Sequence, residues 1–343
     1  MHDAIRDALN AVLDQHDVPE LVCQSAVAAI MDGQCDEISI AAFLTALRVK
    51  GEAVDEIVGA ARAMIERAGR VPTQRTGLLD TCGTGGDELR TFNISTATAF
   101  VAAACGIPVA KHGNRGVSSS SGSADVLEAL GVQTQLTPDQ VGRCLDEIGI
   151  GFCFAPVFHG AMRHAAPVRK ALRFRTLFNL LGPLTNPANA EFQLLGASQT
   201  ATAAKLAHAV ARLGRKRTLV VCGNNQLDEV SLWGETAVFE VVGADVERRY
   251  WTAATFGLSE CSVAELQVAS PAESATRIRA VFNGERSAAR DIIIANAAAA
   301  LIAAQAETDP LIAAARAARA LDNGETSSLL ARFAERTQTL AAK

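Results

Sequence analysis

The sequence lacks paired cysteines, an excess of basic residues and any long uninterrupted apolar run, and each absence excludes a class of protein. None of its eight cysteines belongs to a Cys-x-x-Cys pair, which argues against a thiolate zinc site. Acidic residues outnumber basic ones by 37 to 32, whereas a general nucleic-acid binder presents a basic surface. The longest apolar stretch, residues 292–306, is interrupted by Asn296 and Gln305. It is too short to span a bilayer and predicts a buried helix.

Aromatic side chains are also scarce, at 5% of the 343 residues, while alanine is abundant, a composition that favours closely packed helices. The apolar fraction of 49% is that of a globular protein with an ample core, built as one large domain or two unequal ones. The first seven residues carry no apolar signal region, so a reducing cytoplasm is the expected compartment. We expect neither a membrane nor a nucleic acid as a partner.

Hydrophobic periodicity divides the chain into two parts. Residues 1–70 carry helical spacing throughout, and no strand pattern precedes Gly77. Beyond Gly77, short apolar runs alternate with helical stretches, the pattern of a mostly parallel sheet flanked by helices. We therefore expect a small all-helical domain over 1–72, joined in space by part of 165–190, and a larger α/β domain over 73–343. The expected strands are 78–81, 108–110, 151–154, 218–222 and 237–242; the expected helices are 95–105, 124–130, 138–148, 200–213 and three that begin near 271, 287 and 310.

A glycine-rich segment, residues 79–87, is the most informative part of the sequence. Gly83, Gly85 and Gly86 follow a short apolar run and precede the polar stretch 91–96. Glycines let backbone N–H groups approach an anion closely, and a strand, such a loop and a helix start together form a phosphate cradle. The loop matches neither the P-loop nor the dinucleotide-binding pattern. An ordinary glycine turn at a strand end remains the alternative.

A second anion-facing loop is expected at residues 111–123, on the same edge of the sheet. Lys111 and Arg115 supply positive charge, Asn114 supplies an amide, and the serines 118–121 supply hydroxyl and N–H donors. Ligands of such sheets gather at the carboxyl ends of the strands. The alternative is a solvated basic turn followed by a linker.

Two adjacent acids and a proline-rich stretch complete the candidate site. Asp228 and Glu229 follow a predicted strand and a turn, and in a loop both can converge on a cation such as magnesium. Taken alone, such a pair is commonly a solvated surface pair. In the stretch 156–187, Arg169 can fork onto a carboxylate, whereas His164 and Arg175 are interpreted as structural.

The order of these motifs closely resembles that of the anthranilate phosphoribosyltransferase family, and the resemblance covers nearly the whole chain. It rests on residues 80–87, 93–96, 111–115, 122–128, 179–187 and 228–229. The resemblance implies transfer of the phosphoribosyl group of 5-phosphoribosyl 1-diphosphate to the amine of anthranilate, in tryptophan biosynthesis. It also implies a small helical domain and a larger α/β domain, a fold shared with pyrimidine nucleoside phosphorylases, and a homodimer formed through the small domains.

The resemblance also implies roles for individual residues. Anthranilate would meet Gly83, Asn114 and Arg169, with His112 and His159 lining its approach. Two magnesium ions are implied, one held by Ser95 and Glu229 and one by Asp228 and Glu229. No residue is assigned as an acid or base, because an aniline is already neutral at pH 7. The implied donor-binding residues are Gly83, Gly86, Asp87, Thr91, Asn93, Ile94, Ser95, Thr96, Lys111, His112, Gly113, Asn114, Arg115, Gly116, Val117, Ser118, Ser119 and Ser123.

Three positions depart from the family pattern. Arg173 stands where glycine is usual, Gly160 where proline is common, and Ser120 where a basic residue is frequent. Because a glycine at position 173 can adopt φ > 0, the family pattern does not predict the backbone conformation around Arg173. Two alternatives of related fold are a pyrimidine nucleoside phosphorylase, whose loop reads Lys-His-Ser-Thr-Gly-Gly, and a non-catalytic relative that binds nucleic acid. The loop here lacks that lysine and serine, and the chain is acidic.

Overall fold

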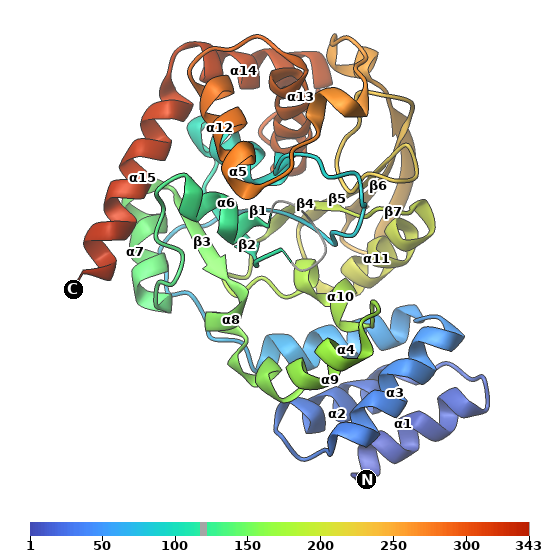
Figure 1. The fold of residues 1–343 in the computed structure, drawn as a ribbon. Helices are drawn as coiled ribbons and strands as arrows, with labels where there is room; N and C mark the ends of the chain where they lie inside the picture. The colour runs from blue at the N-terminus through green and yellow to red at the C-terminus, as the bar shows by residue number, and fades with distance from the viewer. Residues whose placement is uncertain (117–121, 343) are drawn as a thin grey trace.

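The computed structural model describes residues 1–116 and 122–342, in which a small helical domain lies beside a larger α/β domain (Figure 1). The apolar spacing of the first 66 residues gives helices whose inner faces are buried against one another. None of the helices in these described ranges is long and apolar enough to cross a membrane. The helices of the small domain are α1 (Asp3–Leu13), α2 (Glu20–Met31), α3 (Glu37–Lys50) and α4 (Val54–Glu66).

A seven-stranded sheet forms the centre of the large domain, in the order β3-β2-β1-β4-β5-β6-β7. The five strands from β3 to β5 run parallel, and β6 and β7 add an antiparallel edge. The expectation of a mostly parallel sheet is confirmed, although the central strand β4 and the edge strand β7 were not foreseen. The strands are β1 (Leu79–Gly83), β2 (Val109–Gly113), β3 (Ile150–Phe154), β4 (Phe192–Gly196), β5 (Arg217–Gly223), β6 (Thr236–Val242) and β7 (Asp245–Trp251).

Helices cover both faces of this sheet, and the pleat divides the buried side chains between two hydrophobic clusters. On β4, Leu194 belongs to the cluster under α5 and α13, whereas Leu195 belongs to the cluster that includes α11 and the small domain. The stretch expected to be a buried helix lies largely within α13, which is buried along most of its length. These helices are α5 (Ile94–Ala104), α6 (Ser123–Ala129), α7 (Pro138–Ile148), α11 (Thr200–Leu213), α12 (Pro271–Phe282), α13 (Ala288–Ala303), α14 (Pro310–Asp322) and α15 (Glu325–Ala341).

The chain between β3 and β4 leaves the large domain, reaches the small domain and returns. In Figure 1 its green helix α9 lies against the blue helices, where α9 contacts α3 and α10 contacts α4. Arg173 ends α9 with φ of 56°, the left-handed conformation that favours glycine, so the arginine adopts the backbone of a glycine. The segment consists of α8 (Ala155–Phe158), η1 (Gly160–His164), α9 (Ala166–Leu172), α10 (Phe178–Leu181) and η2 (Gly182–Leu184).

Candidate active site

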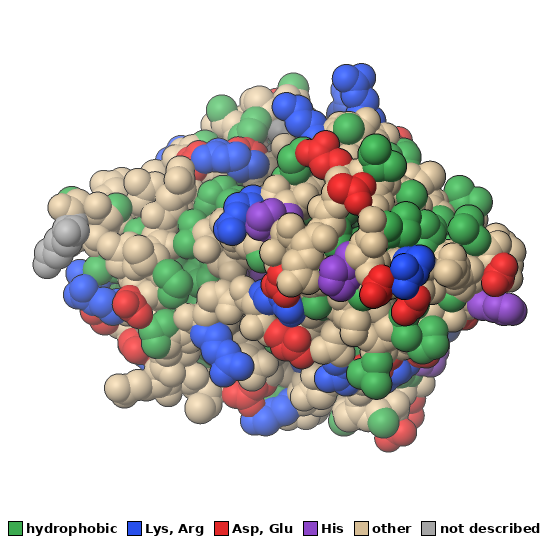
Figure 2. Space-filling view, turned by 90° about the horizontal axis from the view of Figure 1, so that it is seen from below, with side chains coloured by type: hydrophobic (Ala, Val, Ile, Leu, Met, Phe, Trp, Pro, Cys, Tyr) green, Lys and Arg blue, Asp and Glu red, His purple; other side chains and the backbone are tan. Residues whose placement is uncertain are grey.

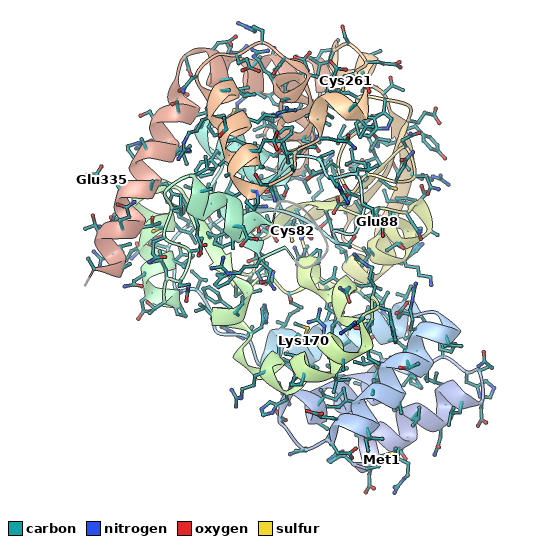
Figure 3. All side chains as sticks on the ribbon, in the orientation of Figure 1. Met1, Cys82, Glu88, Lys170, Cys261 and Glu335 are labelled. Atoms are coloured by element: carbon teal, nitrogen blue, oxygen red, sulfur yellow. The ribbon has the colours of Figure 1, made fainter. Side chains whose placement is uncertain are left out.

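A cavity of about 310 Å³ opens at the carboxyl ends of β1 and β2, where a parallel sheet is expected to bind ligands. The loops after β1 and β2, the loop after β5 and the segment between α9 and α10 all contribute to its wall. Figure 3 shows Cys82 and Glu88, which flank the glycine loop, on the side of the large domain that faces the segment carrying Lys170. The site therefore draws residues from both structural parts of the chain.

The glycine loop is held against Asp228. Gly85 and Gly86 have φ of 64° and 78°, and the Gly85 N–H donates to Asp228 Oδ2 at 2.7 Å. A Cβ at Gly83 or at Gly196 of β4 would collide with Asp228, so these two positions leave room only for hydrogen. The glycines thus allow the loop and an acid 143 residues further along the chain to share one wall of the cavity.

Three carboxyl groups meet on this wall, those of Asp87, Asp228 and Glu229. Burial raises the pKa of the Glu229 carboxyl well above its usual range, and the negative charge of Asp228 raises it further. Burial, together with the charge of Asp228, likewise raises the pKa of Asp87 to about 7. Three acids so close together repel one another when ionised, and a cation between them would relieve the repulsion.

The surroundings of these acids suit magnesium. The Lys111 ammonium group donates to the Thr81 carbonyl at 2.5 Å and to Ser95 Oγ at 3.2 Å, which brings a hydroxyl ligand to the same wall. Within the described ranges no three His, Cys, Asp or Glu side chains form a complete metal site. Magnesium nevertheless takes only one or two carboxylates and completes its shell with water and phosphate oxygens. Ser95, Asp228 and Glu229 fit that requirement.

The loop that carries the acids is braced from behind. Val230, directly after Glu229, donates its N–H to the Asn296 side-chain oxygen at 2.8 Å, and the Asn296 amide donates back to the Val230 carbonyl at 3.0 Å. Asn296 belongs to α13 and is fully buried. The polar residue that interrupts an otherwise apolar stretch therefore holds the acidic loop in place.

The N-terminus of α5 also faces the cavity. Asn93 caps this helix, since its side-chain oxygen accepts the Thr96 N–H at 2.9 Å. The positive end of the helix dipole at this terminus favours an anion in front of it. Asn93, Ile94 and Ser95 line the cavity, whereas Thr96 is buried behind its wall.

On the second loop, one basic side chain is already paired. The Arg115 guanidinium binds Asp125 at 2.8 Å and Glu128 at 2.7 Å, so it braces the loop against α6. Gly116 donates its N–H to Asp125 at 2.9 Å. Val117, Ser118 and Ser119, which the family resemblance implies as donor-binding, lie outside the described residues, as does Ser120.

The opposite end of the cavity holds a basic side chain with no ion pair among the described residues. The Arg169 guanidinium stacks over the Phe178 ring at 5.6 Å from its centre, and burial lowers its pKa. The rings of His112 and His159 lie 5.1 Å apart. Burial lowers the pKa of His112 to about 4 and that of His159 to about 3, so both rings are neutral at pH 7.

Most of the residues proposed from the sequence line this one cavity. Exceptions among the described residues are Thr96 and His159, both of which are buried behind the wall. The wall also includes residues that were not assigned to the site from the sequence, among them Arg90, Arg175 and Phe178. The proposed residues on the wall are Gly83, Gly86, Asp87, Thr91, Asn93, Ile94, Ser95, Lys111, His112, Gly113, Asn114, Arg115, Gly116, Ser123, Arg169, Asp228 and Glu229.

Arg175 is the largest omission, because the sequence interpretation made it structural. Its Nη2 donates to the Thr84 carbonyl at 2.9 Å, across the cavity from its own segment. The only sequence signal for this position was a basic residue close to Phe178 and Asn179, within the segment expected to return to the small domain.

Comparisons with known proteins agree with this architecture. Residues 6–68 match the helical bundle domain of the glycosyl transferase family, and residues 75–327 match its α/β domain. An anthranilate phosphoribosyltransferase of Geotalea uraniireducens is 44% identical over 97% of this chain and 99% of its own length. The crystal structure of anthranilate phosphoribosyltransferase from Thermus thermophilus superposes with a TM-score of 0.91 at 40% identity, covering 97% of this chain and 99% of that one. The enzyme from Saccharomyces cerevisiae in complex with PRPP and Mg also gives a TM-score of 0.91, at 27% identity and 99% coverage of both chains.

Proposed function

Because the chain belongs to the anthranilate phosphoribosyltransferases of the glycosyl transferase family, we propose that its cavity joins anthranilate to a phosphoribosyl donor. The enzyme transfers the 5-phosphoribosyl group of 5-phosphoribosyl 1-diphosphate to the anthranilate amine in L-tryptophan biosynthesis, giving N-(5-phosphoribosyl)anthranilate and diphosphate. The observation that carries the site assignment is the contact of the Gly85 N–H with Asp228. It joins the phosphate-type loop to the acidic pair.

The donor occupies the end of the cavity formed by the glycine loop, the N-terminus of α5 and the second loop. Backbone N–H groups of the glycine loop and the positive end of the α5 dipole bind its phosphate oxygens. Arg115 contributes through its backbone, since its guanidinium is paired with Asp125 and Glu128. Magnesium, as two ions held by Ser95, Asp228 and Glu229, offsets the charge of the diphosphate. Lys111 positions Ser95 for this role.

Anthranilate occupies the end near Arg169, with Gly83 where the two substrates meet. The Arg169 guanidinium lacks an ionic partner among the described residues, and a planar carboxylate matches its paired N–H groups. Asn114, which also lines the cavity, offers an amide, and the neutral ring of His112 forms part of the wall with the neutral ring of His159 behind it, so neither adds charge. The carboxylate is thereby directed to Arg169, which leaves the amine facing the ribose carbon.

Transfer of the phosphoribosyl group depends on two things: stabilising the negative charge of the leaving diphosphate, and holding the two substrates in line. As the bond between the ribose C1 and the diphosphate oxygen breaks, negative charge grows on the diphosphate, and the loop N–H groups stabilise it more than they stabilise the ground state. The ribose carbon gains oxocarbenium character, the neutral amine attacks it as diphosphate leaves, and the new secondary amine then releases one proton to solvent. No side chain has to generate the nucleophile. Holding both substrates in line can lower the barrier by about 7–11 kcal/mol.

A homodimer formed through the small domains, with a domain boundary at 72/73, completes the proposal. Large apolar side chains are exposed on the outer surface of the small domain, where Figure 2 shows basic and acidic side chains mingled with apolar ones. Leu21, Ile38 and Val49 are more than two-thirds exposed, which leaves apolar area for a second copy to cover. Ile38→Glu with Val49→Glu is expected to shift the chain from dimer to monomer in sedimentation equilibrium. An unchanged mass would contradict this interface.

The activity is tested by following anthranilate fluorescence with the purified chain. We expect anthranilate to be consumed only when 5-phosphoribosyl 1-diphosphate and Mg²⁺ are both present. Thymidine with inorganic phosphate serves as a control for the related phosphorylase reaction, and we expect no thymine to be released. Persistent anthranilate fluorescence under all conditions would overturn the proposed function.

A further inference from the structure

Arg175 links the donor end of the cavity to the segment that carries Arg169. It lies between α9 and α10, in a stretch fixed on both sides. Arg173 turns the chain with its left-handed backbone, and the Thr176 N–H donates to the Asn179 side chain at 2.9 Å. Leu177, the next residue, is fully buried in the cluster that includes the small domain. The backbone that presents Arg175 is therefore well supported.

From this segment the Arg175 guanidinium reaches the glycine loop. It donates to the Thr84 carbonyl at 2.9 Å and lies so close to Gly86 that a Cβ there would collide with it. A guanidinium has five N–H donors, and within the described residues only this one bond engages the side chain. None of its nitrogen atoms is among the buried atoms without a partner, so the remaining donors open to the cavity.

The charge environment of Arg175 differs from that of the other basic residues at the donor end. Lys111 is bound to Thr81 and Ser95, and Arg115 is bound to two acids. Arg175 has no carboxylate within 4.0 Å among the described residues, although the charges of Asp228 and Asp87 act on it. Arg175 is thus a half-buried cation directly beside the loop proposed to bind phosphate. Some of its N–H groups make no hydrogen bond among the described residues.

We propose that Arg175 is a donor-binding residue that grips the diphosphate while it pins the glycine loop through Thr84. This inference rests on the proposed function. A planar fork of N–H groups suits two oxygens of a diphosphate, which are already anionic in the substrate and gain charge as the C1–O bond breaks. Because Arg169 lies six residues earlier on the same segment, diphosphate bound by Arg175 also steadies the residue that receives anthranilate.

The experiment compares Arg175→Gln with Arg173→Gln. Both substitutions remove one positive charge from the same stretch, but Arg173 is exposed and does not line the cavity. The first readout is calorimetric binding of inorganic diphosphate with Mg²⁺ to each variant. We expect Arg175→Gln to weaken this binding by about 10- to 100-fold, the range of one or two charge-assisted hydrogen bonds. Arg173→Gln is expected to stay within about twofold of the wild type.

Further readouts separate diphosphate binding from simple bracing of the loop. Arg175→Lys keeps the charge and is expected to recover part of the lost diphosphate affinity. The KM for the phosphoribosyl donor should rise with Arg175→Gln, together with a lower kcat. Thermal denaturation of the variant without ligand is expected to show an intact fold. Wild-type diphosphate affinity in a folded Arg175→Gln protein, or equal loss in Arg175→Gln and Arg175→Lys, would overturn the inference.

The outcomes keep this inference distinct from the proposed function. If the wild-type chain consumes anthranilate while Arg175→Gln binds diphosphate normally, only the role of Arg175 is wrong. If the wild-type chain does not consume anthranilate, the proposed function itself is wrong, whatever Arg175 binds.

Discussion

The two ends of the cavity differ in how their charged groups are satisfied. At the donor end, Lys111, Arg115 and Asp228 already have partners within the protein. At the acceptor end, where anthranilate is proposed to bind, the Arg169 guanidinium lines the cavity, stacks on Phe178 and has no ion pair within the described ranges. Apart from Arg175, whose remaining N–H groups open to the cavity, the charged groups named at the donor end are thus paired before any ligand arrives, whereas Arg169 at the acceptor end is left for the ligand to pair.

This contrast agrees with the chemistry at each end. Charge develops on the diphosphate, and fixed dipoles stabilise a developing charge best when they need not reorganise. Anthranilate arrives with a fixed carboxylate, so one unpaired arginine is enough to orient it. Substitutions at the donor end are therefore expected to reduce turnover, and substitutions at the acceptor end to reduce affinity.

The largest effect is expected at the acids of the donor end. Asp228→Asn with Glu229→Gln removes the negative charges proposed to hold magnesium, and we expect turnover to fall at least about 10³-fold with the fold intact. Anthranilate fluorescence measures turnover, and circular dichroism monitors the fold. The matched control is Asp245→Asn with Glu247→Gln on the exposed strand β7. Wild-type turnover by the Asp228/Glu229 variant would refute the metal assignment.

A smaller, different effect is expected at the acceptor end. Arg169→Ala should raise the KM for anthranilate by about 10- to 100-fold with a smaller change in kcat, because a charge-assisted pair to the ground-state carboxylate is lost. Arg169→Lys should recover part of this loss. Lys170→Ala, at the exposed next residue, is the control in the same kinetic assay. An unchanged KM for anthranilate in Arg169→Ala would contradict the role of Arg169.

The neutral histidines at the acceptor end predict a loss of stability in acid. Burial lowers the pKa of His159 from 6.5 in the unfolded chain to about 3, so below pH 6.5 the unfolded state binds a proton that the folded state does not. Between pH 6.5 and 5 this difference destabilises the fold by up to about 2 kcal/mol. His159→Gln should therefore lose less unfolding free energy over that interval, as measured by urea titration. His208→Gln, at an exposed position, is the control; an equal acid loss in wild type and His159→Gln would disprove the expectation.

The smallest effect is expected at a donor-end residue whose charged side chain is already paired with carboxylates of the protein. Arg115→Ala should change the KM for the phosphoribosyl donor by less than about threefold, because its guanidinium pairs with Asp125 and Glu128. The exposed pairs themselves contribute only about 0.5 kcal/mol to stability. Steady-state kinetics with varied donor provide the measurement. A rise of the KM above about tenfold would mean that the side chain leaves its acids to bind the donor.

Much of the fold could be predicted where local signals were complete. The helix predicted at 138–148 is observed at those residues because Thr137 caps its start, proline occupies its first turn and Gly149 ends it in the left-handed conformation. The helix at 200–213 likewise ends at a glycine, Gly214. Strands β1, β2, β3, β5 and β6 were each expected within a few residues of their observed bounds.

The elements that were missed lack those local signals. β4 carries the buried polar residue Gln193 and follows a proline-rich stretch, so its apolar run is short. β7 is an exposed edge strand whose glutamate and arginines mask the alternating pattern. In the site, the motifs predicted most of the cavity wall. The position of Arg175 depends on the turn at Arg173 and on packing between distant segments, which no local pattern encodes.

Two hydrogen bonds between Asn296 and Val230 fasten the acidic loop of the active site to helix α13. They therefore link catalysis to the stability of the layer of helices that contains α13. The acidic loop cannot detach from α13 without leaving a buried amide and a backbone group unpaired, which costs about 1–3 kcal/mol for each. Fraying confined to this loop is therefore suppressed. On heating, inactivation should coincide with cooperative melting of the helical layer behind the sheet, with no earlier inactive but folded state.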